Sequence, residues 1–486
     1  MSIEPLAGLD SVFVTMDSPN APLHVGMLLE MEPSPGDIIE PRQRFERIQT
    51  TIHERLAHLA VLRRRVLRVP FDLGPPVLVD DPEFDIAFHV VRRAVPAPGG
   101  SRELDDLVAR IMARPLAPDR PLWEISVIEG LAKGRTALLA KVHHALADGV
   151  AGVTVFAELF DLGPERRSIP TVPPFETPPA LPSPLELLAK SSSEILRRPG
   201  AFLEALGSSL ERLAGKVDEM VGVASPEESH DGISLGSLFD APTTPLSGTV
   251  SYARRFERFS LDLPAVKTVA RRHGATVTDF AMTMLGGALR HMLELRDELP
   301  EKDLVAFVPV NLRPAGTEGD LGNQVSGRLA ALCSSIEDPF ERLEAVAAIG
   351  RQVRQSEEAP SDLLNEVADI AGPALASMAG HVINAFDLFE HVPSVANVIL
   401  SSVPGPPIPL WCAGEKMVRA SPIGPLMFNQ SLNVTVLGYG DSLEFGILAC
   451  ARKVPDVEIL KMFMEEEGIR LLGASGDHPE EIPEAQ

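Results

Sequence analysis

The chain has few cysteines and no long apolar run, and these absences exclude several classes of protein. Cys333, Cys412 and Cys450 are far apart, odd in number and set among apolar residues. No Cys-x-x-Cys pair occurs, so neither a disulfide framework nor a thiolate zinc site is predicted, and a reducing, cytosolic setting fits best. No apolar stretch reaches the roughly 18–20 residues that a membrane span requires. The N-terminus lacks the basic and apolar segments of a signal peptide.

The chain also has too few basic residues to balance its acidic ones. Against 68 Asp and Glu stand 44 Lys and Arg, which gives a formal net charge of −24. Such a field repels nucleic-acid phosphates and anionic lipid headgroups, so we expect no nucleic-acid partner. Any contact with a membrane or lipid droplet would be apolar. The expected location is cytoplasmic, peripheral at most on such a surface.

Proline content and hydrophobic periodicity divide the chain into four segments. Residues 1–163 and 248–473 each have the pattern of a mixed α/β domain. Residues 164–247 are proline-dense at first and then helical in period, which predicts a crossover linker, because proline runs cannot form core helices or central strands. Residues 474–486 form an acidic tail. The length of 486 residues and the 45% apolar content agree with two or three folded domains.

Some predicted elements bear on function. A helix is predicted from Arg42 to Arg65, and strands at Leu122–Ile128 and Thr136–Val142, the latter apolar enough to be buried on both faces. In the second half, helices are predicted at Leu263–His273 and Thr278–Leu295. Further predicted elements are helices at Ser101–Ala113, Val150–Phe160, Arg342–Gln355 and Leu363–Phe389, and strands at Val250–Leu261, Leu304–Val310, Ala396–Ser402 and Leu432–Ala449.

Two familiar enzyme patterns fail in their context. Gly232–Gly236 matches Gly-x-Ser-x-Gly, but no strand precedes it and no helix follows, as a hydrolase nucleophile requires. His53 and His58 are five residues apart, so they do not share a helix face as paired zinc ligands would.

The strongest local signal is the string KVHHALADGVAG, which places His143, His144, Asp148 and Gly149 at the end of a buried strand. Adjacent strand residues point to opposite faces, so one histidine can enter a channel while the other packs. The alternative is a pair of core histidines followed by a helix-starting aspartate. The complete His-His-x-x-x-Asp-Gly string between a strand and a helix favours a catalytic role.

Histidine suits proton transfer because its ordinary pKa is about 6.5. It can accept a proton from a hydroxyl at cytosolic pH and return it to a leaving group. The motif contains no serine or cysteine nucleophile. We therefore expect direct transfer, in which the substrate hydroxyl attacks and no acyl-enzyme forms.

The string HHALADG resembles the HHxxxDG motif of coenzyme A-dependent acyltransferases. A set of further blocks resembles one branch, the bacterial wax ester synthase/diacylglycerol acyltransferase family, and covers nearly all of residues 7–473. These blocks are LAGLDSVFVTMDSPNAPLHVGMLLEME, DPEFDIAFHVVRRAVPAPGG, RPLWEISVIEGL, FVPVNLRP, LGNQVSGRLAAL, SSVPGPP and LNVTVLGYGDSLEFG. The resemblance implies an α/β (α+β) fold of two chloramphenicol-acetyltransferase-like domains with a tunnel between them. Acyl-CoA would enter from one side and an alcohol from the other.

The resemblance also implies roles for the motif residues. His144 would be the general base, and His143 would position it or pack beside it. Asp148 would be structural, in the turn with Gly149, and held by an arginine. Arg313 of VNLRP is the candidate partner, with a solvated loop arginine as the alternative.

One position departs from the family pattern, and other residues are weaker candidates. The family's Asn-Asp pair at a helix start is here Thr278 and Asp279, which we interpret as a helix cap rather than a catalytic pair. Trp123 of the Pro-Leu-Trp block is a candidate substrate contact, with core packing as the alternative. Ser326 and Asn433 are candidate donors to the oxyanion of the transition state.

The phosphates of CoA need local positive charge within this acidic chain. Arg271, Arg272 and His273 form one such cluster, which is equally typical of a solvated helix end.

The function expected from the resemblance is transfer of a fatty acyl group from acyl-CoA to a fatty alcohol or diacylglycerol. Acyl-CoA would be a substrate, and no metal or other cofactor is implied. Two alternatives stay open. One is a related transferase that uses another alcohol or amine, or a carrier-protein thioester. The other is a catalytically silent lipid-droplet-binding protein.

Overall fold

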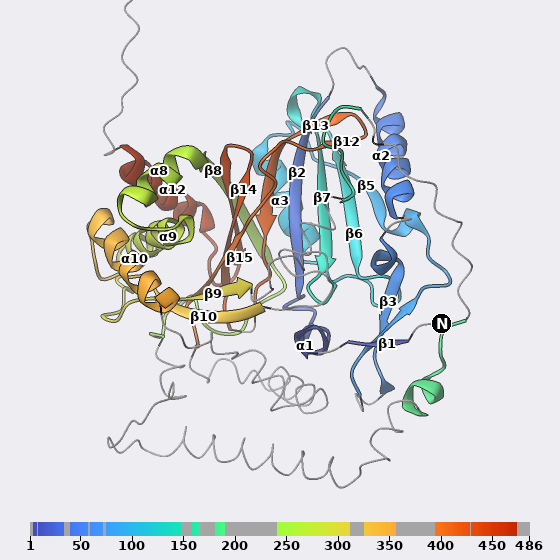
Figure 1. Cartoon of the computed structure of the whole chain (residues 1–486), viewed down its shortest axis with the longest axis horizontal. Coiled ribbons are helices and arrows are strands. Elements are labelled where there is room, and N and C mark those ends of the chain that lie inside the picture. Colours follow the sequence, from blue (N-terminus) through green and yellow to red (C-terminus); the bar gives the residue numbers. More distant parts are fainter. Residues whose placement is uncertain are drawn as a thin grey trace, which may run out of the picture.

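Two six-stranded sheets lie side by side, with helices packed around them (Figure 1). The computed structural model describes residues 3–6, 8–33, 39–56, 59–70, 74–146, 158–165, 167, 180–189, 241–311, 325–355, 394–427 and 429–473. Each sheet mixes antiparallel and parallel pairs of strands. The predicted mixed α/β fold class is confirmed.

The first sheet has the strand order β12-β13-β2-β7-β6-β5. Its strands are β2 (His24–Glu32), β5 (Val90–Ala94), β6 (Trp123–Glu129), β7 (Thr136–His143), β12 (Trp411–Cys412) and β13 (Glu415–Ile423). Around it are the helices α1 (Gly8–Met16), α2 (Pro41–Arg55) and α3 (Ser101–Met112), the short helices η2 (Ala60–Arg63), η4 (Ile86–Phe88) and η5 (Ala132–Gly134), and the three strands β1 (Glu4–Pro5), β3 (Arg64–Leu67) and β4 (Val77–Asp80) of a small sheet. Every residue of β7 is buried, as its continuous apolar run predicts.

The second sheet has the strand order β10-β9-β11-β14-β15-β8. Its strands are β8 (Arg254–Asp262), β9 (Val305–Asn311), β10 (Val325–Ala331), β11 (Val398–Val403), β14 (Leu432–Tyr439) and β15 (Ser442–Cys450). Its helices are α8 (Leu263–Arg272), α9 (Val277–Glu294), α10 (Pro339–Gln355) and α12 (Val457–Gly473). Helix α9 is buried from Asp279 to Leu289 and packs between α10 and α12, which explains its apolar sequence.

The two sheets share chain segments. Strands β12 and β13 come from the second half of the sequence, yet β13 pairs antiparallel with β2, with Ile423 opposite Gly26 and Lys416 opposite Glu32. The first sheet is therefore complete only when the second half has folded against it. Where the two domains and their linker begin and end along the chain stays a prediction.

A buried ion cluster joins the sheets as well. Arg258 of β8 forms an ion pair with Glu30 of β2, and its Nε lies 2.6 Å from a carboxylate oxygen of Asp105 on α3. Arg254 donates a hydrogen bond of 2.6 Å to the carbonyl of Asn20, in the loop before β2. Because charges out of water must be matched, this cluster fixes how the halves meet.

Most predicted elements are confirmed, with boundaries shifted by a few residues. The strands expected around Leu122–Ile128 and Thr136–Val142 are β6 and β7, and the helices expected after Leu263 and Thr278 are α8 and α9. The helix predicted to continue to Arg65 is wrong beyond Arg55. Arg64 instead begins β3, where it pairs with Asp80 of β4, so sheet pairing there overrides the helical spacing.

Three predicted segments lie wholly or almost wholly outside the described residues: the helices Val150–Phe160 and Leu363–Phe389 and the tail 474–486. Within the described part of the chain, no helix is long and apolar enough to cross a membrane.

Candidate active site

The paired histidines lie where β7 ends and a tight turn begins. His143 is the last residue of the strand and stands opposite His24 of β2. The amide of Leu146 donates a 2.9 Å hydrogen bond to the carbonyl of His143, which closes the turn around His144 and Ala145. The chain reverses at this point, so the two rings are held on different backbone geometries rather than on one straight strand.

His143 is buried and its ring is already engaged by the protein. Only 3% of the residue is exposed, and the Ala145 amide donates to its Nδ1 at 3.2 Å. The neutral ring therefore carries its proton on Nε2, which lies 3.9 Å from a carboxylate oxygen of Asp17. Burial, with the neighbouring His144, lowers the pKa of His143 to about 3. His143 is thus neutral at neutral pH, and its basic nitrogen already accepts a hydrogen bond.

His144 is half-buried and is held through its backbone. Its amide donates a 2.9 Å hydrogen bond to the carbonyl of Leu23, and its ring packs against Phe13 of α1, with 4.4 Å between ring centroids. The loop before β2 and helix α1 therefore set the position of this imidazole. Of the two histidines, His144 is the less buried.

Asp17 belongs to this site, although the sequence motifs did not single it out. Its carboxylate accepts a 2.7 Å hydrogen bond from the amide of Leu23, the residue whose carbonyl holds His144. Burial raises the pKa of Asp17 above its ordinary value. The available signal was its place in the opening block that carries the family resemblance, six residues before Leu23.

The strand beneath the histidines is anchored to helix α3. Lys141, two residues before His143, is buried and donates to the carbonyls of Ile111 and Arg114 at 3.2 and 2.9 Å. Burial lowers the pKa of Lys141 to about 8. His24 lies beside it, with its Nε2 2.9 Å from the carbonyl of Met112. The end of α3 is therefore capped by the two strands that carry the site.

Several sequence-predicted site residues lie outside the described part of the chain. Asp148, Gly149 and Arg313 are among them, so the proposed Asp148–Arg313 pair stays a prediction. Ser326 lies on β10 opposite Val310, and its side chain is likewise outside the description.

The expected cap at Thr278 is wrong in position. The N-cap of α9 is Thr276, whose hydroxyl accepts a 3.1 Å hydrogen bond from the Asp279 amide, while the Asp279 carboxylate accepts one of 2.8 Å from the Thr276 amide. Thr278 is the second residue inside the helix. The expectation failed because Thr276 and Thr278 both precede the apolar run, and only Thr276 has the three-residue spacing to Asp279 that a capping box requires.

Trp123 and Asn433 are both buried and hydrogen-bonded. The indole of Trp123 donates to the carbonyl of Leu62 at 2.6 Å and stacks on His89, which are the contacts of the core-packing alternative. The Asn433 amide donates to the carbonyl of Pro425 at 2.8 Å, and its oxygen accepts from the Thr435 hydroxyl. A substrate role for either residue stays a prediction.

The basic cluster lies at the end of α8. Arg271 and Arg272 are exposed in its last turn, and His273 has its Nδ1 3.4 Å from a carboxylate oxygen of Glu344. Among the described residues, no group of three or more His, Cys, Asp and Glu side chains is arranged to hold a metal ion.

Comparison with known proteins identifies related chains over nearly the whole length. The profile described as the wax ester synthase/diacylglycerol acyltransferase catalytic domain matches residues 6–281, and that of the WS/DGAT C-terminal domain matches residues 321–470. A Mycobacterium tuberculosis protein named diacyglycerol O-acyltransferase is 33% identical over 486 residues, covering 99% of this chain and 92% of its own. A second protein of that name from the same species is 34% identical, covering 95% and 97%.

Solved structures agree with this. A wax ester synthase/diacylglycerol acyltransferase from Marinobacter aquaeolei VT8 superposes with a TM-score of 0.68 at 26% identity, covering 97% of this chain and 99% of its own. The starter condensation domain of rhizomide synthetase, solved with C8-CoA and Leu-SNAC, shares the fold at 13% identity, with a TM-score of 0.55 and coverage of 98% and 95%.

Proposed function

The chain belongs to the wax ester synthase/diacylglycerol acyltransferase family and is an acyl-CoA-dependent O-acyltransferase, and from this premise we propose its acceptor and its catalytic base. The acceptor is a long-chain alcohol or a diacylglycerol, so the product is a wax ester or a triacylglycerol. The base is His144.

The observation that supports His144 is the unequal environment of the two histidines. The basic nitrogen of His143 accepts from Ala145, and its pKa of about 3 makes it a poor base at neutral pH. His144 is half-buried in the turn, with its backbone fixed by Leu23 and its ring braced by Phe13. Rigid placement with partial access is what a general base requires.

The proposed step is alcoholysis of a thioester. His144 accepts the proton of the acceptor hydroxyl as its oxygen attacks the thioester carbonyl carbon, which forms the new C–O bond and a tetrahedral oxyanion. The oxyanion collapses, the C–S bond breaks, and the CoA sulfur takes the proton from His144. His143 and Asp17 take no proton in this scheme. They hold the turn, because His143 bonds Ala145 and Asp17 bonds Leu23.

The test is release of free CoA from palmitoyl-CoA by wild type and by His144→Ala, with hexadecanol, dioleoylglycerol or no acceptor. Removal of a general base costs roughly 10²–10⁴-fold in rate. We expect that loss in His144→Ala with an unchanged melting temperature. His53→Ala, at an exposed position on α2, is the control and should keep full activity.

The outcomes separate the alternatives. Acceptor-dependent CoA release that His144→Ala abolishes supports the proposal. Turnover above about a tenth of wild type in His144→Ala would refute the role of His144, given the expected range. Release without any acceptor would indicate a thioesterase. Absence of release across a broad panel of alcohols and amines would favour the lipid-binding alternative.

A further inference from the structure

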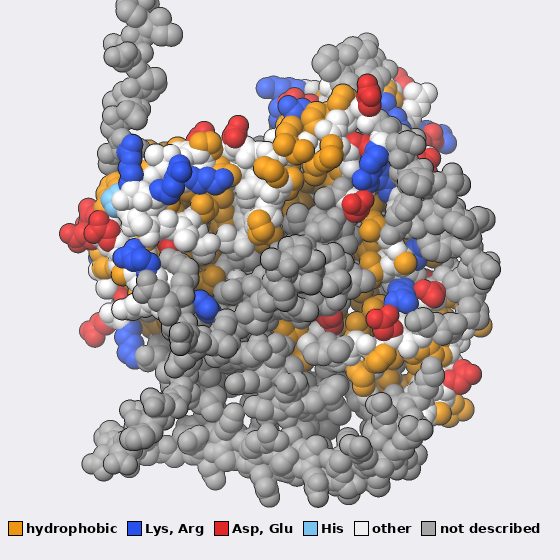
Figure 2. Space-filling model, in the orientation of Figure 1, with side chains coloured by type: hydrophobic (Ala, Val, Ile, Leu, Met, Phe, Trp, Pro, Cys, Tyr) orange, Lys and Arg blue, Asp and Glu red, His pale blue; other side chains and the backbone are white. Residues whose placement is uncertain are grey.

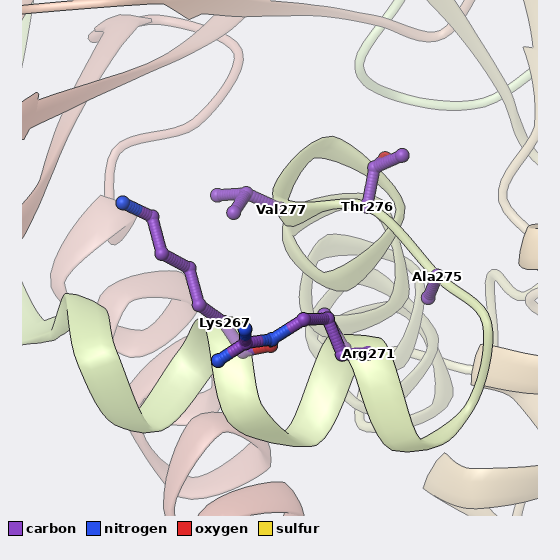
Figure 3. Close-up of a pocket in the computed structure, with 6 residues that line it drawn as sticks. Lys267, Arg271, Ala275, Thr276 and Val277 are labelled. Carbon is purple, nitrogen blue, oxygen red and sulfur yellow. The ribbon is translucent and has the colours of Figure 1, made fainter.

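A pocket of about 260 Å³ lies between the end of α8 and the start of α9. It is lined by Lys267, Ala270, Arg271, Ala275, Thr276 and Val277. The side chains of Lys267 and Arg271 rise from the same side of α8, where Thr276 and Val277 begin α9 (Figure 3). One lysine and one arginine therefore share a single cavity.

These two cations have no carboxylate partner among the residues that the structure describes. Arg271 uses its Nε to donate to the Lys267 carbonyl at 3.1 Å, and no acidic oxygen of the described chain lies within ion-pair distance of either side chain. In the first turn of α9, the carboxylate of Asp279 accepts a hydrogen bond from the Thr276 amide in the capping box. Lys267 and Arg271 are both exposed, and together they place two positive charges at one cavity of a chain whose net charge is −24.

The surroundings add positive charge. Arg272 follows on the same turn, and Arg351 of α10 donates to the carbonyl of Gly274 in the loop between the two helices. Figure 2 shows Lys and Arg side chains gathered on the part of the surface where Figure 1 places α8. Basic residues in the last turn of a helix also favour its dipole, which accounts for Arg271 and Arg272 by themselves. It does not account for Lys267, which lies more than a turn further back on α8, on the same cavity.

We propose that this pocket binds the phosphates of CoA, with Lys267 and Arg271 as the recognising side chains. This inference rests on the proposed use of acyl-CoA. A guanidinium contacts phosphate oxygens through two parallel N–H groups, and an ammonium adds a compact positive charge. CoA carries its phosphates at the opposite end of the pantetheine arm from the thioester, so a phosphate pocket distinct from the histidine turn is what this donor requires. The proposed phosphate site is therefore the pair Lys267 and Arg271, which line one cavity, rather than the Arg271–Arg272–His273 cluster that the sequence suggested.

The test measures binding to the full chain by calorimetry, so it does not depend on turnover. The ligands are CoA, dephospho-CoA, which lacks the 3′-phosphate, and pantetheine, which lacks all phosphates. The variants are Lys267→Gln and Arg271→Gln, with Arg272→Gln as the matched control, because Arg272 carries the same charge on the same turn but does not line the pocket.

We expect each pocket variant to weaken CoA binding roughly tenfold, as loss of one charge-assisted contact would. Arg272→Gln should bind CoA within about twofold of wild type, as a screened surface charge would. Pantetheine should bind the variants and wild type alike. If the pocket variants bind CoA more weakly but bind dephospho-CoA as wild type does, the pocket holds the 3′-phosphate. If they bind both ligands more weakly to the same extent, the pocket holds the pyrophosphate. Either result supports the proposal.

Three results would overturn the proposal. They are unchanged CoA binding in both pocket variants, a loss of CoA binding in Arg272→Gln as large as in the pocket variants, or a loss of pantetheine binding in the pocket variants as large as their loss of CoA binding. A parallel arm uses vesicles of phosphatidic acid and phosphatidylcholine. Loss of vesicle binding in the pocket variants with CoA binding unchanged would assign the cations to a lipid headgroup instead. If wild type binds CoA through these residues but transfers no acyl group, the proposed function fails while the phosphate site stands.

Discussion

Replacing His143 with asparagine should remove an acid sensitivity of the fold. Burial and the neighbouring His144 lower the pKa of His143 to about 3 in the folded protein, whereas an unfolded chain has a histidine pKa of about 6.5. As the pH falls below about 6.5, the unfolded chain binds a proton that the folded chain does not. The free energy of unfolding therefore decreases as the pH decreases through this window.

The linkage relation gives the size of the effect. For these two pKa values, His143 should cost about 2 kcal/mol of stability at about pH 5 relative to about pH 7.5. Because pH 5 lies well above the pKa of His143 in the folded protein, this free-energy difference is set mainly by protonation of the unfolded chain. Asp17, 3.9 Å away, favours the charged ring, but its carboxylate is committed to Leu23 and burial raises its own pKa. Burial, rather than Asp17, therefore sets the direction of the pKa shift of His143.

The assay is a urea titration at several pH values between about 5 and 7.5, followed by tryptophan fluorescence. The chain has two tryptophans, Trp123 on β6 and Trp411 on β12, and both belong to the sheet that carries His143. In His143→Asn, the side-chain amide can still accept from the Ala145 amide but does not titrate. The difference in unfolding free energy between wild type and variant, plotted against pH, isolates the histidine. His53→Asn, at an exposed position on α2, controls for loss of a histidine.

The reasoning is refuted by a difference curve that stays flat across this range. A curve of opposite slope, with wild type gaining stability toward pH 5, would show that the folded protein holds His143 as an imidazolium paired with Asp17.

Three further outcomes are expected. Thr276→Ala should lower stability by roughly 0.5–2 kcal/mol through loss of the α9 cap, and Thr278→Ala clearly less; equal losses by thermal unfolding would place the cap wrongly. Arg258→Met should cost roughly 3–5 kcal/mol, because two buried carboxylates lose their cation, and urea titration would contradict this if the loss stayed below about 1 kcal/mol. Asp17→Ala should lose about 1–3 kcal/mol of stability and also CoA-release activity, since the Leu23 amide loses its acceptor. Asp17→Asn should keep most of the stability and most of the activity. Identical melting curves and rates for these two variants would exclude the role of that hydrogen bond.

The sequence by itself determined the elements whose signal is local. The apolar run Thr136–Val142 specifies a strand buried along its whole length, and the helical period after Leu263 and Thr278 specifies α8 and α9. The string HHALADG and the ordered blocks around it identified the family that the comparisons confirm. These features depend on spacing within a few residues or on motif order, both of which a single sequence displays.

Tertiary structure decided what depends on residues far apart in the chain. Strand β13 joins β2 across nearly four hundred residues, a pairing that no local period encodes. The helical pattern running through Arg64 gives way to a strand because β3 pairs antiparallel with β4, from Arg64 opposite Asp80 to Leu67 opposite Val77. The family resemblance implied different roles for the two histidines, but only the folded chain shows the contacts that distinguish them. Ala145 and burial keep His143 neutral, while Leu23 and Phe13 hold the less buried His144, because hydrogen bonding and burial are properties of the assembled turn rather than of the motif.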